Sequence, residues 1–294
     1  MLNINSQELQ VLTAYIYDIC GIHLDSSKEY LVKTRLDTLL KTYGCASYSE
    51  FYYRARSDKS GKINTDIVNA ITTPETLFFR DKLPFDILKE KLLKELIQNK
   101  SKSAIPGQLR IWSAASSTGQ EIYSIAIMIQ ETITNLQKNR VSLLATDISD
   151  VVLNIAKAGR YNSFEVSRGL TKHQLNRYFI EKEQYWQLKD NIRQMVRFQK
   201  LNLMKPFVGL SNFDIVFCRN VAIYFTLEDR KNCLTALLIQ LLPMVICLLV
   251  HRSFSQVLVI DLKQFGMAKQ FIIKKLSNIL DFLWKSIYHH TQQY

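Results

Sequence analysis

The sequence predicts an α/β protein: an all-helical N-terminal domain, then a doubly wound parallel sheet with a small antiparallel β excursion. Residues 1–71 carry apolar side chains at helical spacing, whereas residues 105–237 alternate short apolar runs with amphipathic segments. One apolar run, Phe213–Phe217, is closely followed by Arg219 and Asn220, which the middle of a buried strand would not tolerate. Because open parallel sheets bind ligands beyond the carboxyl ends of their strands, this junction predicts a binding site as well as a strand.

The N-terminal 71 residues are expected to form a helical bundle, either purely structural or serving as a recognition domain. A first helix over residues 7–20 places its apolar side chains on one face. Ser26 and Glu29 form a capping-box pattern that predicts the start of a second helix, and Gly44 predicts its end. Further helices are expected over residues 48–55 and 66–71, with a flexible polar loop over residues 57–65.

The first predicted strand, Leu109–Ala114, leads into a loop of small residues, 115–119, and then a helix that carries Glu121 near its start. Small side chains let a ligand approach the backbone amides of such a loop. The loop holds a single glycine instead of the G-x-G-x-x-G pattern, so a phosphate cradle is poorly supported. A ligand without phosphates, such as S-adenosylmethionine, fits better.

The second predicted strand, residues 141–147, ends in Asp147. An acid at this position of a doubly wound fold accepts hydrogen bonds from ribose hydroxyls. The alternative is that Asp147 caps the helix that begins near Ser149, since aspartate is a favoured N-cap. The two roles are compatible.

Later segments predict two further features. Residues 178–200 alternate apolar and polar positions, which predicts the small antiparallel excursion, with turns near Glu183 and residues 189–190. Residues 233–250 carry no charge, which allows a membrane span or a buried helix followed by a strand at 244–250. The central Pro243 favours the second interpretation, and edge strands are expected at 257–260 and 271–273.

Charge and cysteine usage bound the environment. The net charge of +12 favours acidic partners, whether nucleic acid, anionic membrane or a Glu-rich helical protein. The five cysteines are widely spaced and form no C-x-x-C pair, and the histidines lack metal-binding spacing, so we expect a reducing cytoplasm and no metal site. The first residues show no signal-peptide pattern.

Several motifs resemble those of the CheR family, methyltransferases that esterify glutamate side chains on chemotaxis receptors. Residues 213–225 resemble the family's FCRNVxIYF signature, and residues 72–81 resemble its TTNxTxFFR(E/D) linker, although Pro74 replaces the usual Asn. Residues 112–126 resemble WSAAxSTGEEPYSIA. Shorter likenesses are ASDID at 145–149, the AxxGxY loop at 157–170 and VxFxxxNL at 196–203. The resemblance covers residues 5–237.

The resemblance implies an S-adenosylmethionine-dependent methyltransferase sheet over residues 105–237, reached through a linker and first helix at 72–104. The cofactor-binding residues that it implies are Thr76, Arg80, Glu121, Asp147, Asn202, Leu203, Arg219 and Asn220. Glu121 would face the methionine ammonium group, Asp147 the ribose, and Asn202 and Leu203 the adenine. Arg80 and Arg219 would orient the substrate carboxylate, and Tyr224 would line the methyl-transfer site.

The implied partner is the helical cytoplasmic region of a methyl-accepting receptor, met by the N-terminal domain. The glycine-bearing insertion of relatives that bind a receptor tail is absent, so tail-peptide docking is not expected. We expect a monomer that neither binds nucleic acid nor inserts into membrane.

Two other classes remain open. One is a catalytically impaired relative that binds cofactor or receptor without turnover. The other is a nucleic-acid methyltransferase, which the charge allows, but the chain lacks the (N/D)PPY-type motif for base amines.

The resemblance ends near Leu237, and residues 238–294 diverge. No Glu follows Glu228 and one Gly, Gly266, follows Gly209. Back-translated and shifted by two bases, this tail can spell segments that resemble the last strands of the family. We therefore hypothesise a frameshift near residues 234–240, which would leave the tail poorly matched to the sheet.

Restoring the reading frame at the DNA level should raise soluble yield and melting temperature. A tail that evolved with this sheet would have local propensities, apolar pattern and packing that all favour the same fold. Expressing the two forms side by side measures both quantities. Equal stability and activity would contradict the frameshift hypothesis.

Overall fold

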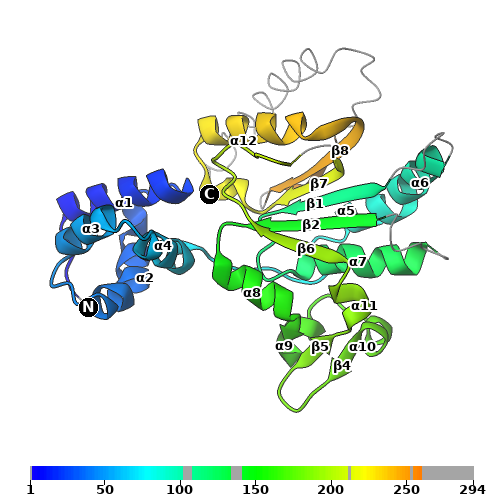
Figure 1. Ribbon diagram of the computed structural model, residues 1–294, viewed down its shortest axis with the longest axis horizontal. Coiled ribbons are helices and arrows are strands. Elements are labelled where there is room, and N and C mark those ends of the chain that lie inside the picture. Colours follow the sequence, from blue (N-terminus) through cyan, green and yellow to red (C-terminus); the bar gives the residue numbers. More distant parts are fainter. Residues whose placement is uncertain (1, 102–107, 134–140, 211–212, 252–253, 260–294) are drawn as a thin grey trace.

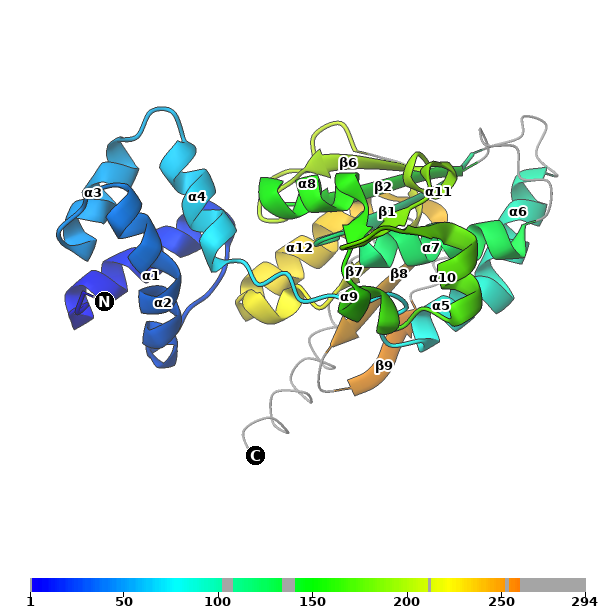
Figure 2. The ribbon, with the colours of Figure 1, turned by 90° about the horizontal axis from the view of Figure 1, so that it is seen from below.

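A helical domain and an α/β domain lie side by side and are joined by a linker over residues 72–82 (Figure 1, Figure 2). The computed structural model describes residues 2–101, 108–133, 141–210, 213–251 and 254–259. Both predicted parts of the fold are therefore confirmed, and the α/β domain is an open, mostly parallel sheet covered by helices on both faces.

The helical domain contains α1 (Ser6–Cys20), α2 (Glu29–Thr42), α3 (Tyr48–Ser57) and α4 (Lys62–Ile71). Asn5 and Glu8 form a reciprocal capping box at the start of α1, and Gly21 ends this helix in the left-handed conformation. The apolar faces of the four helices meet in a core of their own, which includes Leu12, Ile16, Leu36, Phe51 and Ile67.

The predicted start of the second helix was wrong. The capping box at Ser26 does not open α2, which begins three residues later, after a 3₁₀ turn, with no side-chain cap. Asp25 instead accepts the amide of Ser27, and Glu29 pairs with Lys33, 2.7 Å away on the same helix.

The loop expected over residues 57–65 is short and held by its own side chains. Asp58 accepts hydrogen bonds from the amides of Ser60 and Ile63, at 2.9 and 2.8 Å, and α4 begins at Lys62. A polar turn thus serves as the N-terminal cap of a helix that starts four residues earlier than predicted.

The main sheet positions the site. Its strands, in spatial order, are β6 (Val196–Lys200), β2 (Val141–Asp147), β1 (Leu109–Ala114), β7 (Phe213–Arg219), β8 (Leu241–His251) and β9 (Phe254–Val259). The first five are parallel and β9 is antiparallel to β8. Strand order reverses between β1 and β7, and ligands of doubly wound sheets bind at the carboxyl ends beside such a switch point.

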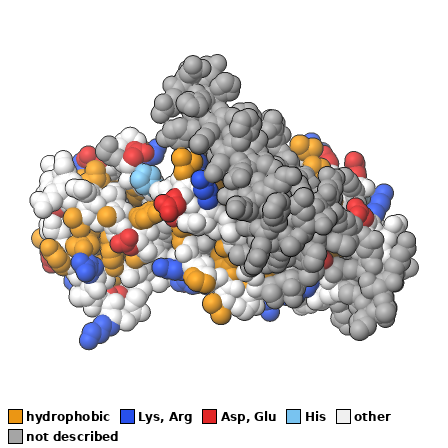
Figure 3. Space-filling model, turned by 90° about the horizontal axis from the view of Figure 1, so that it is seen from above, with side chains coloured by type: hydrophobic (Ala, Val, Ile, Leu, Met, Phe, Trp, Pro, Cys, Tyr) orange, Lys and Arg blue, Asp and Glu red, His pale blue; other side chains and the backbone are white. Residues whose placement is uncertain are grey.

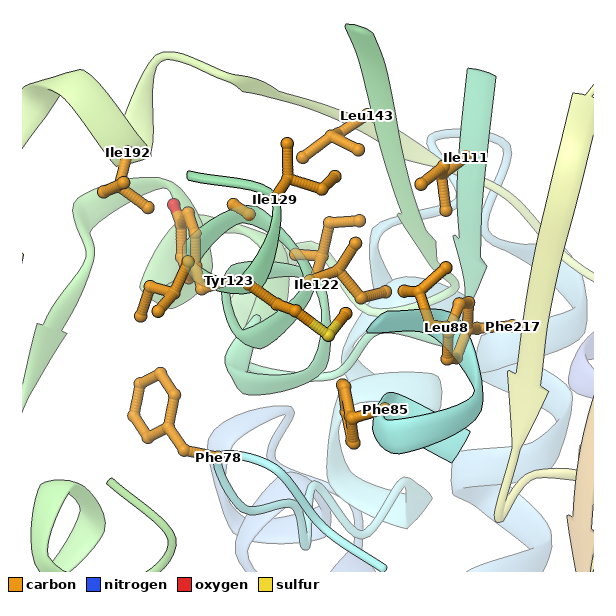
Figure 4. Close-up of a cluster of buried hydrophobic side chains, with 14 of the residues drawn as sticks. Phe78, Phe85, Leu88, Ile111, Ile122, Tyr123, Ile129, Leu143, Ile192 and Phe217 are labelled. Carbon is orange, nitrogen blue, oxygen red and sulfur yellow. The ribbon is translucent and has the colours of Figure 1, made fainter. Parts of the chain in front are cut away.

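Helices cover both faces of this sheet. They are α5 (Leu83–Ile87), a π-helical turn (Leu88–Leu92), α6 (Leu93–Ser101), α7 (Gln120–Thr132), α8 (Asp150–Ala158) and α12 (Leu227–Ile239). Alternate strand residues face opposite sides. Ile111 and Phe217 pack against α5 and α7, whereas Trp112 and Val216 pack on the side of α12. Figure 4 shows the first cluster, in which the rings of Phe85 and Phe217 stack with centroids 6.1 Å apart.

A small sheet between α8 and β6 forms the predicted excursion. Its strands are β3 (Arg160–Tyr161), β5 (Trp186–Leu188) and β4 (Phe179–Glu181), accompanied by α9 (Ser163–Ser167), α10 (Lys172–Tyr178) and α11 (Asp190–Arg193). The excursion begins and ends earlier in the chain than the predicted residues 178–200, since its strands lie between Arg160 and Leu188. Residues 196–200 belong to the main sheet, because they pair in parallel with residues 143–147 of β2.

The uncharged run at 233–250 forms the end of α12 and most of β8, as the interpretation without a membrane span predicted. No helix in the described part of the chain is long and apolar enough to cross a membrane. Phe213 pairs with Leu241, but Ile215 pairs with Ile246, so the register shifts around Pro243, which has no amide hydrogen to donate. The edge strand expected at 257–260 corresponds to β9, while the one at 271–273 lies outside the described residues.

Replacing Phe85 by alanine should lower the free energy of unfolding by about 3–5 kcal/mol, because a buried ring leaves a cavity between α5 and the sheet. Leu83 begins the same helix and is 47% exposed, so its replacement by alanine should cost less than about 1 kcal/mol. Urea unfolding of the two variants measures the difference. Equal losses would show that α5 does not depend on this contact.

Candidate functional site

A cavity opens at the carboxyl ends of β1, β2 and β7, between the sheet, the linker and the helical domain. All nine residues that the sequence predicted for the site line it: Thr76, Arg80, Glu121, Asp147, Asn202, Leu203, Arg219, Asn220 and Tyr224. The structure thus brings together residues that come from five separate segments of the chain. Their individual roles remain proposals.

The loop after β1 has an unusual backbone. Ala115 and Ser117 adopt left-handed φ angles of 59° and 51°, and Gly119 follows at 93°. The amide of Ser117 donates to Asp147 at 2.8 Å, which ties this loop to the end of β2. The loop therefore turns its backbone and its small side chains toward the cavity, as expected for a ligand-binding loop.

Backbone strain in the described part of the chain is concentrated at this site. The non-glycine residues with positive φ are Phe79, Asp81, Ala115, Ser117 and Asn220. Three of them line the cavity and the other two flank Arg80. Such conformations cost of order 1–3 kcal/mol each and persist where the surrounding structure enforces them, as at ligand-binding sites.

Asp147 is held by the backbone at the tip of β2. Its carboxylate accepts the amides of Ser117 and Ser149, at 2.8 and 3.1 Å. Burial raises the pKa of Asp147, although these amide donors oppose the shift. The N-cap of α8 is Ser149, which accepts the amide of Val152, so the capping role considered for Asp147 was wrong.

Arg219 at the end of β7 is the centre of a buried ionic network. Its side chain is 1% exposed and donates to Glu121 at 2.8 Å, to Asp81 at 2.9 Å and to the carbonyl of Arg80 at 2.6 Å. Glu121 also accepts from the Ser113 hydroxyl at 2.8 Å. Arg219 therefore fixes Glu121 and the linker relative to the sheet.

Arg80 differs from Arg219 in its surroundings. Its side chain is 19% exposed and donates to the carbonyl of Glu75 at 3.0 Å, while its Nε lies 4.0 Å from Asp81. A guanidinium at the cavity that is less completely paired is better able to bind an anion from outside.

The helical domain forms part of the cavity wall, which sequence reasoning missed. Cys20, Ile22 and Ile71 line the cavity, and burial raises the pKa of the Cys20 thiol to about 11. Asn202 donates its side-chain amide to the carbonyl of Ile19 at 3.1 Å and accepts the amide of Met204. No sequence motif predicts these contacts, because they join segments that are far apart in the chain.

Tyr224 also belongs to the boundary between the two domains. Its side chain packs against the core of each domain, and its carbonyl accepts the amide of His23 at 2.9 Å. The residue expected at the methyl-transfer site is thus positioned partly by the helical domain.

Polar atoms without partners suit a polar ligand in this cavity. Within the described structure, the hydroxyls of Ser116 and Ser117 and the Nε of Arg219 are buried and make no hydrogen bond. All three residues line the cavity together with the acids Glu121 and Asp147. Hydroxyl, guanidinium and carboxylate groups complement the carboxylate, ammonium and ribose groups of S-adenosylmethionine.

The doubly wound sheet, the loop of small residues and the polar lining of the cavity fit the class of S-adenosylmethionine-dependent methyltransferases. The CheR methyltransferase SAM-binding domain matches residues 74–251, and the CheR methyltransferase all-alpha domain matches residues 7–72. The chain belongs to the CheR methyltransferase family.

Curated relatives cover most of the chain. Chemotaxis protein methyltransferase Cher2 of Pseudomonas putida is 40% identical over 79% of this chain and 83% of its own length. Chemotaxis protein methyltransferase 1 of Pseudomonas aeruginosa is 43% identical over 77% and 82%, respectively. The chemotaxis protein methyltransferase of Vibrio parahaemolyticus is 37% identical over 82% and 87%. The SAM-binding match ends at residue 251, so the likeness to the family continues beyond Leu237, where the sequence analysis ended it.

Replacing Asp147 by asparagine should weaken S-adenosylmethionine binding by about 1.5–3 kcal/mol at neutral pH, as for a lost hydrogen bond to a charged group. In the unmodified protein, affinity should fall on acidification, because protonation removes the carboxylate charge that would accept hydrogen bonds from the ribose hydroxyls. Since burial raises the pKa of Asp147, this loss should begin at a higher pH than for an ordinary aspartate.

Calorimetric titration at several pH values measures both effects. Asp150 supplies a matched control, since it is an acid at the start of α8 that pairs with Lys200. Replacement of Asp150 by asparagine should change neither the affinity nor its pH dependence. An unchanged affinity in the Asp147 variant would exclude the ribose role.

Proposed function

We propose that the protein transfers a methyl group from S-adenosylmethionine to glutamate carboxylates on the helical cytoplasmic region of methyl-accepting chemotaxis receptors. The products are a glutamate methyl ester and S-adenosylhomocysteine. Family membership supports the reaction class, and the curated relatives are named for chemotaxis. The observation that carries the proposal is a partly exposed guanidinium, Arg80, beside an acid-lined cavity at the switch point of the sheet.

Methyl transfer to a glutamate carboxylate needs little acid–base catalysis from the protein. The acceptor glutamate is already ionised at neutral pH and attacks the methyl carbon in line. S-adenosylmethionine supplies that methyl group on a positively charged sulfur, which leaves as a neutral thioether. The protein must therefore align the two groups and exclude water between them.

The two arginines divide this task. Arg80 would bind the incoming carboxylate, because Arg219 already has three protein partners. Arg219 would hold Glu121 ready for the cofactor ammonium group and fix the backbone of the linker next to Arg80. This assignment narrows the sequence-based expectation that both arginines orient the substrate. Tyr224 would line the path between cofactor and acceptor.

The partner is a Glu-rich helical surface, which the net charge of +12 would attract. Acidic and basic side chains are interspersed on the described part of the face in Figure 3, instead of forming the continuous basic surface typical of nucleic-acid binding. We therefore favour a protein acceptor over a nucleic acid and propose a monomeric enzyme.

The pairing of β7 argues against the alternative of a catalytically impaired relative. The register shift around Pro243 faces the start of β7, and regular pairing resumes from Ile215 and continues to Arg219 opposite Val250. The end of β7 that carries the site residues therefore keeps a neighbouring strand. Cofactor binding without methyl transfer would select this alternative.

Replacing Arg80 by alanine should lower the rate of methyl transfer about 10- to 100-fold, the equivalent of one lost hydrogen bond to a charged group. S-adenosylmethionine affinity should change less, because Glu121 and Asp147 remain. Radiolabelled methyl transfer to receptor cytoplasmic fragments, with alkali-labile label as the mark of an ester, measures the rate.

Arg197 supplies the control, since it is exposed on β6 at the far edge of the sheet. Its replacement by alanine should leave the rate unchanged. Full turnover by the Arg80 variant would refute the carboxylate-binding role, and labelled nucleic acid in place of receptor would refute the proposed substrate.

A further inference from the structure

We propose that Tyr161 is a positioning residue that connects the small antiparallel sheet to two walls of the methyl-transfer site. This inference rests on the proposed function and deepens it. Tyr161 belongs to the AxxGxY motif, to which neither the sheet nor the cofactor cavity assigns a role. It is 1% exposed and does not line the cavity itself.

The motif directs this side chain inward. Gly159 ends α8 with a left-handed φ of 62°, and the chain then enters β3, where Tyr161 pairs with Trp186 of β5. A Cβ atom at Gly159 would lie 3.2 Å from Arg193 and 3.3 Å from Leu188. The glycine thus allows a tight turn that sends the second strand residue toward the main domain.

The first wall is the cofactor loop after β1. The hydroxyl of Tyr161 donates to the carbonyl of Thr118 at 2.8 Å. Thr118 follows Ser117, whose amide donates to Asp147, and precedes the helix that carries Glu121. Burial raises the pKa of Tyr161 well above its ordinary value, so the phenol stays protonated and keeps donating.

The second wall is the linker. The ring of Tyr161 meets that of Phe78 edge to face, with centroids 5.0 Å apart, and Phe179 of β4 contacts Phe78 at 5.7 Å. Gly169 packs against the backbone of Phe78, where a Cβ atom on residue 169 would lie 1.8 Å from the carbonyl oxygen of Phe78. Phe78 is therefore enclosed by the small sheet and its loops, two residues before Arg80.

These contacts make Tyr161 the residue where both walls meet. Removing its hydroxyl releases the loop that presents Ser117 but leaves the ring against Phe78. Shortening Phe78 releases the linker but leaves the bond to Thr118. The two changes therefore separate cofactor positioning from acceptor positioning.

The test compares Tyr161→Phe with Tyr178→Phe. Tyr178 is a matched control, because it is buried in the same subdomain and its hydroxyl has no hydrogen-bond partner in the described structure. The Tyr161 variant should raise the Kd for S-adenosylmethionine about fivefold and lower kcat by a similar factor, the worth of one neutral hydrogen bond. The KM for receptor fragments should stay within about twofold, because the ring of the new Phe still packs against Phe78 and the linker that carries Arg80 keeps its position.

Phe78→Leu gives a second, independent reading. It should lower kcat by a larger factor than it changes the cofactor Kd, since the linker carries Arg80. Wild-type Kd and kcat in Tyr161→Phe would overturn the proposal, as would equal losses in Tyr178→Phe. If Tyr161→Phe does not fold, a Phe78→Leu variant with unchanged kcat overturns it instead.

The cofactor Kd keeps the two proposals distinguishable. It is measured by calorimetry without any methyl acceptor. An unmodified protein that binds cofactor but does not label receptors would contradict the proposed function, while the effect of Tyr161→Phe on the Kd would still decide the positioning role.

Discussion

The buried guanidinium of Arg219 is the interaction on which the site depends. It joins three elements that are distant in sequence: the end of β7, Glu121 on α7 and the linker at Arg80 and Asp81. A buried charge needs partners of opposite sign, and removing one partner from such a network costs about 3–5 kcal/mol. The network therefore holds the acid that would face the cofactor and the arginine that would face the acceptor in one fixed arrangement.

The helical domain is a structural part of the catalytic half as well as a candidate recognition unit. Within the described residues, four hydrogen bonds cross the boundary: Asn202 to Ile19, His23 to Tyr224, Tyr17 to Asp229, and Ser149 to Asn69. Two of the α/β-domain residues in these bonds, Asn202 and Tyr224, line the cavity. The cavity and the placement of the helical domain are thus physically linked through shared side chains.

The strained backbone supports the same interpretation. Positive φ angles at Ala115, Ser117 and Asn220 place loop residues of β1 and β7 around one cavity, and packing of the sheet and linker maintains them. The small sheet adds to this support from outside, through Phe78 and Thr118. Positioning, more than any reactive side chain, is what this architecture supplies.

The sequence by itself predicted the doubly wound sheet, because apolar runs that end in polar residues indicate where parallel strands end, as at Asp147, Arg219 and Asn220. The other residues around the cavity were implied by the resemblance to the CheR family. Sequence reasoning was wrong where local contacts compete. Glu29 of the expected capping box pairs with Lys33, and residues 196–200 pair with β2 in the main sheet. Only the tertiary structure decided that Arg219 is already paired and that Asn202 holds α1. Those contacts join residues 98 and 183 positions apart, and no local pattern encodes a partner at such a separation.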